Sequence, residues 1–228
     1  RRCRKIKHNN IPLKLLEGYF SQQNIKLKFS GLENIPKKGA FIMISNHPYG
    51  FLDGLIMLKL LSKEFSKVKI TANFLLKKIP LFSKYAIAVN PFDNIGKKAM
   101  GGTQQVMNNL NEDNPVVLFP AGMVSTNYDG YHKQVRDKEW KDSSKRLIAD
   151  ANVPVFPVYF PGKNSWLFHL MGKIHPILRT MLIPYEFVKV KNTTVSCFIG
   201  KELDKELMNK GYDPEKMYLD FTRDLVKS

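Results

Sequence analysis

The stretch Ile44-Ser45-Asn46-His47-Pro48-Tyr49-Gly50-Phe51-Leu52-Asp53-Gly54 decides the fold prediction, because a strand signal leads into it and a helix signal leads out. The apolar run 40–44 predicts a buried strand, and apolar residues at helical spacing predict a helix over about 51–65. His47 is therefore expected where the strand ends, and Asp53 in the first turn of the helix. Open α/β sheets carry their chemistry beyond the carboxyl ends of the strands, so this junction is the first candidate site.

His47 and Asp53 are suited to removing a proton from an alcohol. A neutral imidazole can accept the proton while a carboxylate fixes its tautomer and stabilises the imidazolium. The two residues are six positions apart, so they would point in different directions on one continuous helix. Pro48 and Gly50 interrupt the chain and could fold the imidazole back over the helix start. On this stretch alone, a purely structural role for both residues is equally open, with Asp53 favouring a helix N-terminus.

Asn46-His47-Pro48 followed by Asp53-Gly54 resembles the first motif of the glycerolipid acyltransferase superfamily. Most of that superfamily has four residues between its His and Asp, whereas this chain has five. This spacing, with Pro after the His and Gly at position 50, resembles the branch labelled hemolysin-like, which includes O-acyltransferases of ornithine and glycine lipids. The resemblance implies a glycerol-phosphate-acyltransferase-like fold in which His47 is the catalytic base and Asp53 orients it.

Three further segments resemble the remaining motifs of the superfamily, in the same order. Val89 with Pro91-Phe92 resembles the second motif of the hemolysin-like form, without the arginine that glycerol-phosphate acyltransferases use for the acceptor phosphate. Phe119-Pro120-Ala121-Gly122 matches the third motif, with Ala121 where the common form has Glu. The run 153–160 matches the fourth motif, and its prolines predict an edge strand or a bulge.

The residues around these motifs are the candidates for substrate binding. Pro120 and Gly122 predict a tight loop whose backbone N–H groups could hold an anionic head or a developing oxyanion, with an ordinary turn as the alternative. Lys78 could meet an anionic substrate group or lie in a solvated turn. In the resembling branch an Asp and a Trp recur near the polar segment 126–142. The candidates are Asn46, Gly50, Lys78, Phe119, Pro120, Ala121, Gly122, Ser125 and Arg136.

The composition indicates a polyanionic partner. Lys and Arg number 36 against 20 Asp and Glu, which gives a formal net charge of +16. Anionic lipid is favoured over nucleic acid because no helix-turn-helix, RNP or zinc-finger pattern is present, and a basic protein without such a partner is the alternative. Cys3 and Cys197 are far apart and without metal-ligand spacing, so we expect free thiols, a reducing compartment, no metal and no cofactor.

Three features of the sequence indicate how the chain would meet a membrane. No run of about 18 apolar residues occurs, so the chain is expected to lie on a bilayer rather than cross it. The basic and amphipathic segment 1–20 could meet lipid headgroups or pack on the domain. The segment 162–184 mixes Trp166 and other apolar bulk with basic residues, which is typical of an interfacial segment, and a helix pair covering the sheet is the alternative. Its His169 and His175 have no carboxylate at a useful spacing, so both are interpreted as structural.

Alternating strand and helix signals predict a single α/β domain over residues 1–228, with a central, largely parallel (mixed) sheet flanked by helices on both faces. The chain starts with Arg1 rather than Met, so we interpret it as part of a longer protein, with any membrane anchor outside the sequence. The other predicted strands are 26–29 at an edge, 68–74, 86–92, 115–119, 153–160 and 195–199. Helices are also predicted over 13–20 and 143–151, and another runs to about Asn111, with the Gly101-Gly102 pair either preceding or interrupting it. Two helical stretches follow Gly200-Lys201, and the last of them covers 214–226.

The motifs together imply an O-acyltransferase that needs no metal and no covalent enzyme intermediate. His47 would take the proton of a lyso-lipid hydroxyl, whose oxygen would attack an acyl thioester of acyl carrier protein or coenzyme A. The missing arginine and Ala121 argue against a phosphate-bearing acceptor, so we expect a lyso-amino-acid lipid and a peripheral protein at the cytoplasmic face of the cell membrane. The alternatives are a 1-acylglycerol-3-phosphate acyltransferase, a hydrolase that releases fatty acid to water, and a non-catalytic lipid-binding membrane adaptor.

Overall fold

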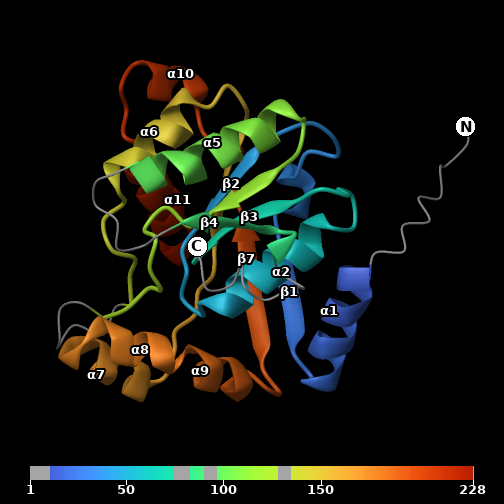
Figure 1. Cartoon of the computed structure of the whole chain (residues 1–228), viewed down its shortest axis with the longest axis vertical. Coiled ribbons are helices and arrows are strands. Elements are labelled where there is room, and N and C mark those ends of the chain that lie inside the picture. Colours follow the sequence, from blue (N-terminus) through green and yellow to red (C-terminus); the bar gives the residue numbers. More distant parts are fainter. Residues whose placement is uncertain (1–10, 74–82, 90–96, 128–134, 228) are drawn as a thin grey trace, which may run out of the picture.

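A computed structural model of the chain describes residues 11–73, 83–89, 97–127 and 135–227. Its centre is a seven-stranded sheet with the order β1-β7-β6-β2-β5-β3-β4 (Figure 1). The strands are β1 (Lys26–Ser30), β2 (Ile42–Ser45), β3 (Lys69–Asn73), β4 (Ala86–Val89), β5 (Val116–Leu118), β6 (Val155–Tyr159) and β7 (Thr194–Ile199). The α-helices are α1 (Ile11–Gln22), α2 (Phe51–Leu61), α5 (Lys97–Asn111), α6 (Asp142–Asp150), α7 (Trp166–Ile174), α8 (Pro176–Met181), α9 (Ile183–Lys189), α10 (Lys205–Asn209) and α11 (Pro214–Lys227).

The strand directions make the sheet mixed but largely parallel. The strands β6, β2, β5, β3 and β4 run parallel to one another, β7 runs antiparallel to β6, and β1 runs parallel to β7. The predicted fold class is therefore confirmed, as is the position of β1 at an edge. The helix predicted to run to about Asn111 begins at Lys97, so of the two alternatives the Gly101-Gly102 pair interrupts the helix rather than preceding it.

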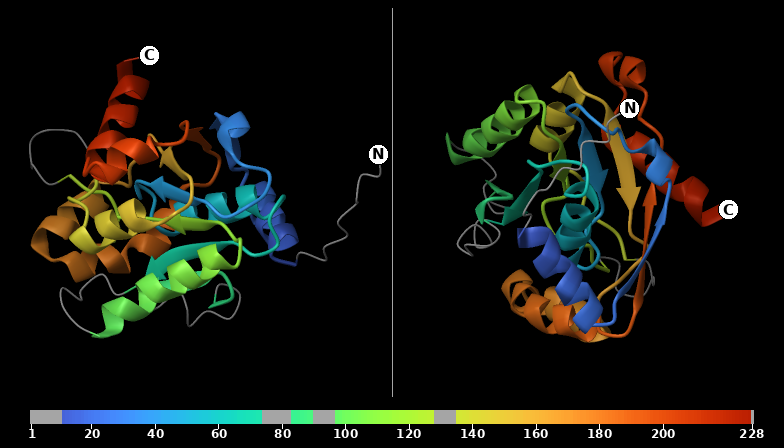
Figure 2. Two further views of the ribbon diagram at one scale, coloured as in Figure 1. Left: turned by 90° about the horizontal axis from the view of Figure 1, so that it is seen from above. Right: turned by 90° about the vertical axis from the view of Figure 1, so that its right-hand side faces the viewer.

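Two hydrophobic cores form because strand side chains alternate between the faces of the sheet. At β2, Met43 and the preceding residue Phe41 point into one core, whereas Ile42 and Ile44 point into the other. The first core is covered by α1 and α2, and the second by α5, α6, α10 and α11, so helices flank the sheet on both sides (Figure 2). Every residue of β2 is buried on both faces, which explains the unbroken apolar run in its sequence.

The edge position that its prolines suggested for β6 is wrong, because β6 lies between β7 and β2. Pro157 is opposite Ile44 of β2, and its carbonyl accepts a hydrogen bond from Gly200 N–H at 2.8 Å on the β7 side. The missing N–H of Pro157 faces that same side, where β7 ends after Ile199. The strand therefore tolerates its proline because the neighbouring strand has already ended there.

The helices α7, α8 and α9 pack at one end of the sheet, next to the residues that follow β2 (Figures 1 and 2). Ser165 caps α7 by accepting a hydrogen bond from Phe168 N–H at 3.4 Å. His175 accepts one from Ile177 N–H at 3.2 Å at the start of α8. Of the expected interfacial segment, Phe168 is fully buried, so the segment is only partly a surface feature. Within the described residues, no helix is both long and apolar enough to cross a membrane.

Candidate active site

The turn between β2 and α2 brings the imidazole of His47 to the carboxylate of Asp53. His47 Nδ1 lies 3.1 Å from Asp53 Oδ2, and Tyr49 N–H donates to the same oxygen at 3.0 Å. Asp53 is in the first turn of α2 and has no exposed surface. The proximity that the sequence predicted is confirmed, and the break at Pro48 and Gly50 produces it.

Gly50 is required at this turn on two grounds. Its φ of 69° lies in the left-handed region that favours glycine. A Cβ at this position would also come within 3.2 Å of Val124 Cγ2 and 3.7 Å of Ile183 Cγ2. Gly50 therefore shapes the backbone around the His–Asp pair, and any contact with a substrate would come from its main chain.

The electrostatics of the pair follow from burial. Burial raises the pKa of Asp53 above its ordinary value, while the hydrogen bond and charge of His47 and the N–H of Tyr49 lower it. When Asp53 is ionised it can only accept hydrogen bonds, so His47 Nδ1 carries the proton and Nε2 carries the lone pair. The His47 side chain is 20% exposed, and its ring stacks on Phe119 with the centroids 4.0 Å apart. The arrangement is that of an oriented imidazole ready to accept a proton.

The loop after β5 holds the main chain of His47. Ser125 N–H donates to the His47 carbonyl at 3.0 Å, and His47 N–H donates to Ser125 Oγ at 3.2 Å. Phe119 N–H donates in turn to Thr71 Oγ1 at 3.2 Å, which fixes the loop to β3. The first and third sequence motifs are therefore physically joined, and Ser125 and Phe119 both lie against the predicted base.

The geometry limits which groups of the loop 120–122 could face a ligand. Gly122 has a φ of 68°, and its N–H donates to the Phe119 carbonyl at 2.9 Å. Pro120 has no N–H, so the N–H of Ala121 remains as the candidate donor among the three. The Ala121 side chain is 2% exposed and belongs to the core of the second sheet face. Any contact between Ala121 and a substrate would therefore be made by the Ala121 backbone.

Asn46 has a different role from the substrate contact that the sequence suggested. Its side-chain Nδ2 donates to the Phe160 carbonyl at 2.9 Å, and its Oδ1 accepts from Phe160 N–H at 2.8 Å. Its backbone N–H donates to the Tyr218 hydroxyl at 3.0 Å. Asn46 joins the ends of β2 and β6 and is a positioning residue for His47.

Asp137 belongs to the site, although it was not among the predicted site residues. Its Oδ1 accepts from His47 N–H at 3.3 Å and from the Ser125 hydroxyl, while its Oδ2 is buried with no hydrogen-bond partner among the described residues. Burial raises the pKa of Asp137 to about 6, against the lowering effect of the Ser125 hydrogen bond and of His47. The Asp that recurs in the resembling branch was the signal that could have identified it.

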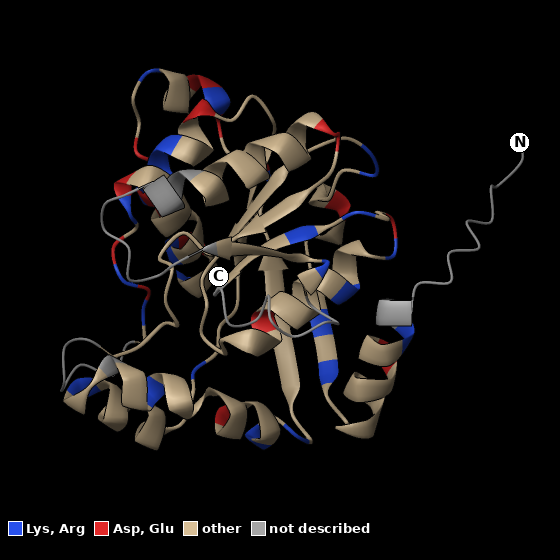
Figure 3. Ribbon diagram, in the orientation of Figure 1, with Lys and Arg blue, Asp and Glu red and all other residues tan. Residues whose placement is uncertain are grey.

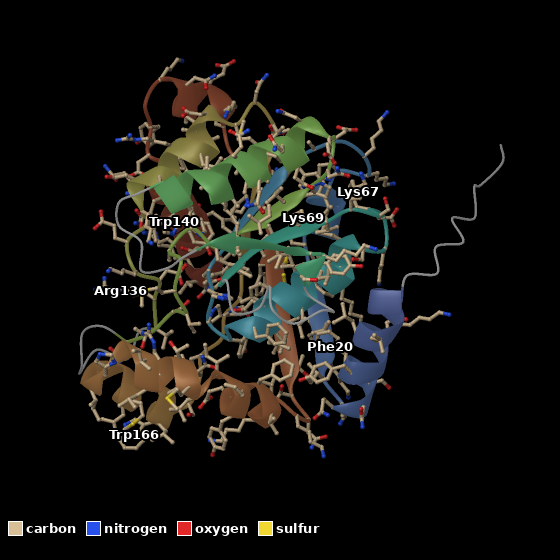
Figure 4. The ribbon with its side chains drawn as sticks, in the orientation of Figure 1. Phe20, Lys67, Lys69, Arg136, Trp140 and Trp166 are labelled. Carbon is tan, nitrogen blue, oxygen red and sulfur yellow. The ribbon has the colours of Figure 1, made fainter. Side chains whose placement is uncertain are left out.

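The remaining predicted residues lie away from the pair or outside the described chain. Arg136 is exposed, pairs through its backbone with Thr126, and extends outward in Figure 4. Lys78 and the segment 90–92 fall outside the described residues. His169 Nδ1 lies 3.0 Å from Thr126 Oγ1, so it ties α7 to the loop after β5. Across the described ranges, no group of three or more His, Cys, Asp or Glu side chains is placed to hold a metal ion.

Comparisons with known proteins identify the family of this chain. Residues 26–161, more than half of the chain, match the family model described as Acyltransferase, so the chain belongs to that family of enzymes. The chain is 26% identical over 225 residues, covering 96% of this chain and 80% of the relative, to a lyso-glycine lipid O-acyltransferase of Bacteroides thetaiotaomicron. It is also 26% identical over 229 residues, covering 97% and 80%, to a protein of the same name from Phocaeicola vulgatus.

A solved structure shares the fold. The 1-acyl-sn-glycerophosphate (LPA) acyltransferase PlsC from Thermotoga maritima aligns over 95% of this chain and 76% of that chain. The TM-score is 0.55 and the sequence identity is 21%, so this likeness concerns the fold. The mixed sheet with flanking helices is therefore that of a known acyltransferase.

Proposed function

We propose that this acyltransferase moves a fatty acyl group from an acyl thioester to the hydroxyl of a lyso-amino-acid lipid. The observation that carries the proposal is the buried Asp53 carboxylate 3.1 Å from His47 Nδ1, which leaves Nε2 as the proton acceptor on an accessible side chain. His47 Nε2 takes the hydroxyl proton as the acceptor oxygen attacks the thioester carbonyl. The tetrahedral intermediate collapses with loss of the thiolate, and the imidazolium returns the proton to the sulfur.

Residues around His47 support this chemistry by holding the imidazole in position. Both backbone groups of His47 are bonded to Ser125, and its ring lies between Asp53 and Phe119, so the base needs little rearrangement to react. The Ala121 N–H is the candidate donor to the oxyanion that forms on the thioester carbonyl. The acyl donor would be acyl carrier protein or coenzyme A carrying the acyl group.

The acceptor assignment rests on two departures from the common motifs and on two relatives. The sequence has no arginine in its second motif, where a phosphate-bearing acceptor would need one, and Ala121 replaces the Glu of the common third motif. Two relatives that span nearly the whole chain are lyso-glycine lipid O-acyltransferases. We propose that such a lyso-lipid is reached at the cytoplasmic face of the cell membrane by a peripherally bound protein.

The test is an acylation assay with purified protein and detergent-dispersed acceptors. Lyso-glycine lipid, lyso-ornithine lipid and lysophosphatidic acid are compared, each with acyl carrier protein and coenzyme A thioesters. We expect an amino-acid lipid to react fastest, and fastest turnover of lysophosphatidic acid would overturn the acceptor assignment. Free fatty acid as the main product would show a hydrolase instead.

A pair of histidine variants tests the base. His47→Ala should lower the rate about 100- to 10,000-fold while the melting temperature stays nearly unchanged. His175→Asn is the matched control, because it keeps a capping side chain at an exposed helix end far along the sequence from the pair. A folded His47→Ala protein that kept more than about a tenth of the rate would exclude general-base catalysis by this residue. Full biological function of His47→Ala in cells would favour a non-catalytic adaptor.

A further inference from the structure

The outer side of α7, α8 and α9 carries a concentration of exposed apolar side chains. Trp166 is 74% exposed, Met181 71% and Val188 66%, although buried positions are usual for residues of this kind. Figure 4 shows Trp166 extending away from the body of the protein. We call the following set the docking face: Trp166, Ile174, Ile177, Leu178, Met181, Tyr185 and Val188.

On α8 and α9 the docking face forms a stripe along one side of the helices rather than scattered residues. Leu182 ends α8 and begins α9 with helical backbone angles, so the two helices follow each other almost without a break. Along them Leu178, Met181, Tyr185 and Val188 recur at intervals of three and four residues, which places them on one side.

The opposite side of α8 and α9 packs against the rest of the protein. Ile183 faces Gly50 of the active-site turn, and Glu186 accepts hydrogen bonds from the Ser165 backbone N–H at 2.8 Å and from its hydroxyl. Phe187 stacks on Tyr19 of α1 with the ring centroids 4.9 Å apart. The helices are therefore anchored on one side, and the apolar stripe on the other side is not needed to hold them in place.

The charges around the docking face fit an anionic surface. Between Pro161 and Thr193 the sequence contains one acidic residue, Glu186, which is 4% exposed. The exposed lysines of this segment are Lys163, Lys173, Lys189 and Lys191 (Figure 3). Lys189 Nζ lies 4.6 Å from the centroid of the Tyr185 ring, so its aliphatic stem runs along the apolar stripe. Apolar bulk with a basic rim is the pattern by which helices lie in a lipid interface.

We propose that the docking face seats the protein on an anionic bilayer, with its apolar side chains among the upper acyl chains and its lysines at the phosphates. The proposal rests on the proposed function in one respect, since an acceptor with a long chain has to be reached in a membrane. The His169–Thr126 contact at 3.0 Å, and the position of Ile183 where a Cβ on Gly50 would meet it, place these helices directly beside the catalytic turn. A helix is about 10 Å thick, so a bilayer on the docking face lies about one helix away from that turn.

The test compares two matched triple variants in vesicle sedimentation. Trp166→Ser, Met181→Ser and Val188→Ser together remove the most exposed part of the docking face, whereas Leu207→Ser, Leu219→Ser and Val226→Ser remove exposed apolar residues of α10 and α11. We expect the first variant to bind phosphatidylglycerol-containing vesicles at least about tenfold more weakly and the second to bind like wild type. Circular dichroism on the same samples checks that both are folded. Equal binding by a folded first variant would overturn the proposal and move the docking surface elsewhere, with residues 1–20 as the next candidate.

Fluorescence gives an independent measurement that does not require the triple variant. The chain has two tryptophans, and Trp140 is buried, so Trp140→Phe leaves Trp166 as the reporter. Brominated acyl chains should quench Trp166 in anionic vesicles, and the quenching should weaken as salt rises. No quenching under conditions where the protein sediments with vesicles would overturn the proposal.

Three further measurements distinguish membrane docking from dimerisation and from a failure of the proposed function. If analytical ultracentrifugation gives a wild-type dimer that the first triple variant dissociates, and vesicle binding is absent, then a second copy covers the docking face and the proposal fails. His47→Gln should bind vesicles like wild type, because docking does not depend on the chemistry. A first triple variant that loses vesicle binding but keeps its rate on detergent-dispersed acceptor supports docking even if the acceptor assignment is wrong.

Discussion

Replacing Asp137 by Asn should remove a pH dependence of stability that the wild-type protein has. The carboxyl group is buried beside the His47 backbone and has a pKa of about 6, compared with an ordinary value of 3.8. The shift is about two units, and at about 1.36 kcal/mol per unit it corresponds to about 3 kcal/mol of unfolding free energy. Desolvation of Asp137 is the dominant cause, with Ser125 and His47 opposing it and the charge of Asp53 adding to it.

The direction in which the unfolding free energy changes with pH follows from proton binding. Because the pKa is higher in the folded than in the unfolded state, the folded protein keeps this proton across the interval between the two values. The unfolding free energy from this group therefore falls as pH rises through that interval and becomes constant above it. Between about pH 4 and about pH 7 the loss amounts to about 2.5 kcal/mol. An Asn side chain does not titrate, so the variant should lack this loss.

The measurement is urea unfolding of wild type and Asp137→Asn at both ends of that interval. The change of unfolding free energy with pH should differ between the two proteins by about 2.5 kcal/mol, with wild type losing more on going to neutral pH. Asp224→Asn on the exposed side of α11 is the matched control and should follow wild type. Parallel pH curves for wild type and Asp137→Asn would show that the carboxyl ionises as it would in water, which would refute the buried placement.

Three further substitutions test the packing of the site. Asp53→Asn should lower the rate about 1,000- to 10,000-fold by favouring the wrong imidazole tautomer, and a steady-state assay showing less than a tenfold loss would contradict the pairing. Gly162→Ala would place a Cβ 2.1 Å from Tyr49 Cζ. It should displace Tyr49, whose N–H donates to the Asp53 carboxylate, and should lower kcat about 10- to 100-fold. The control Gly101→Ala, with open space around its Cβ, should be fully active. Phe168→Ala should reduce the unfolding free energy by about 3–5 kcal/mol in urea titrations, and an unchanged midpoint would contradict its burial.

The features that the sequence predicted are the ones set by local chemistry. The apolar run 40–44 became the central strand, since an unbroken apolar run suits a strand buried on both faces. Pro48 and Gly50 stop the strand and start the helix within a few residues, which is why the six-residue interval brings His47 onto Asp53. The motifs were expected near strand ends, and the structure brings the loop after the third motif to the first, with Ser125 against His47.

The features that the sequence did not predict depend on contacts between distant segments. Asn46 was taken for a substrate contact, but its amide is matched to the backbone of Phe160, which is 114 residues away. Asp137 is 90 residues from His47, and no spacing rule connects them. Pro157 suggested an edge strand because the sequence does not show that β7 ends beside it. In each case the role depends on a tertiary neighbour that the local sequence does not specify, and for Asp137 the available signal was the Asp that recurs in the resembling branch.

The apolar composition of 162–191 acquires a physical explanation from the two sides of its helices. The helices α8 and α9 carry apolar side chains on both sides, yet they lie at the periphery of the protein. Their inner side is explained by Ile183, Glu186 and Phe187, which connect them to the catalytic turn, to the α7 cap and to α1. Water alone does not explain the outer side, because each exposed apolar side chain there has an unfavourable hydration free energy. The bilayer proposed above would supply a second apolar phase, and the same inner contacts would then hold the His47–Asp53 turn at a fixed height above it.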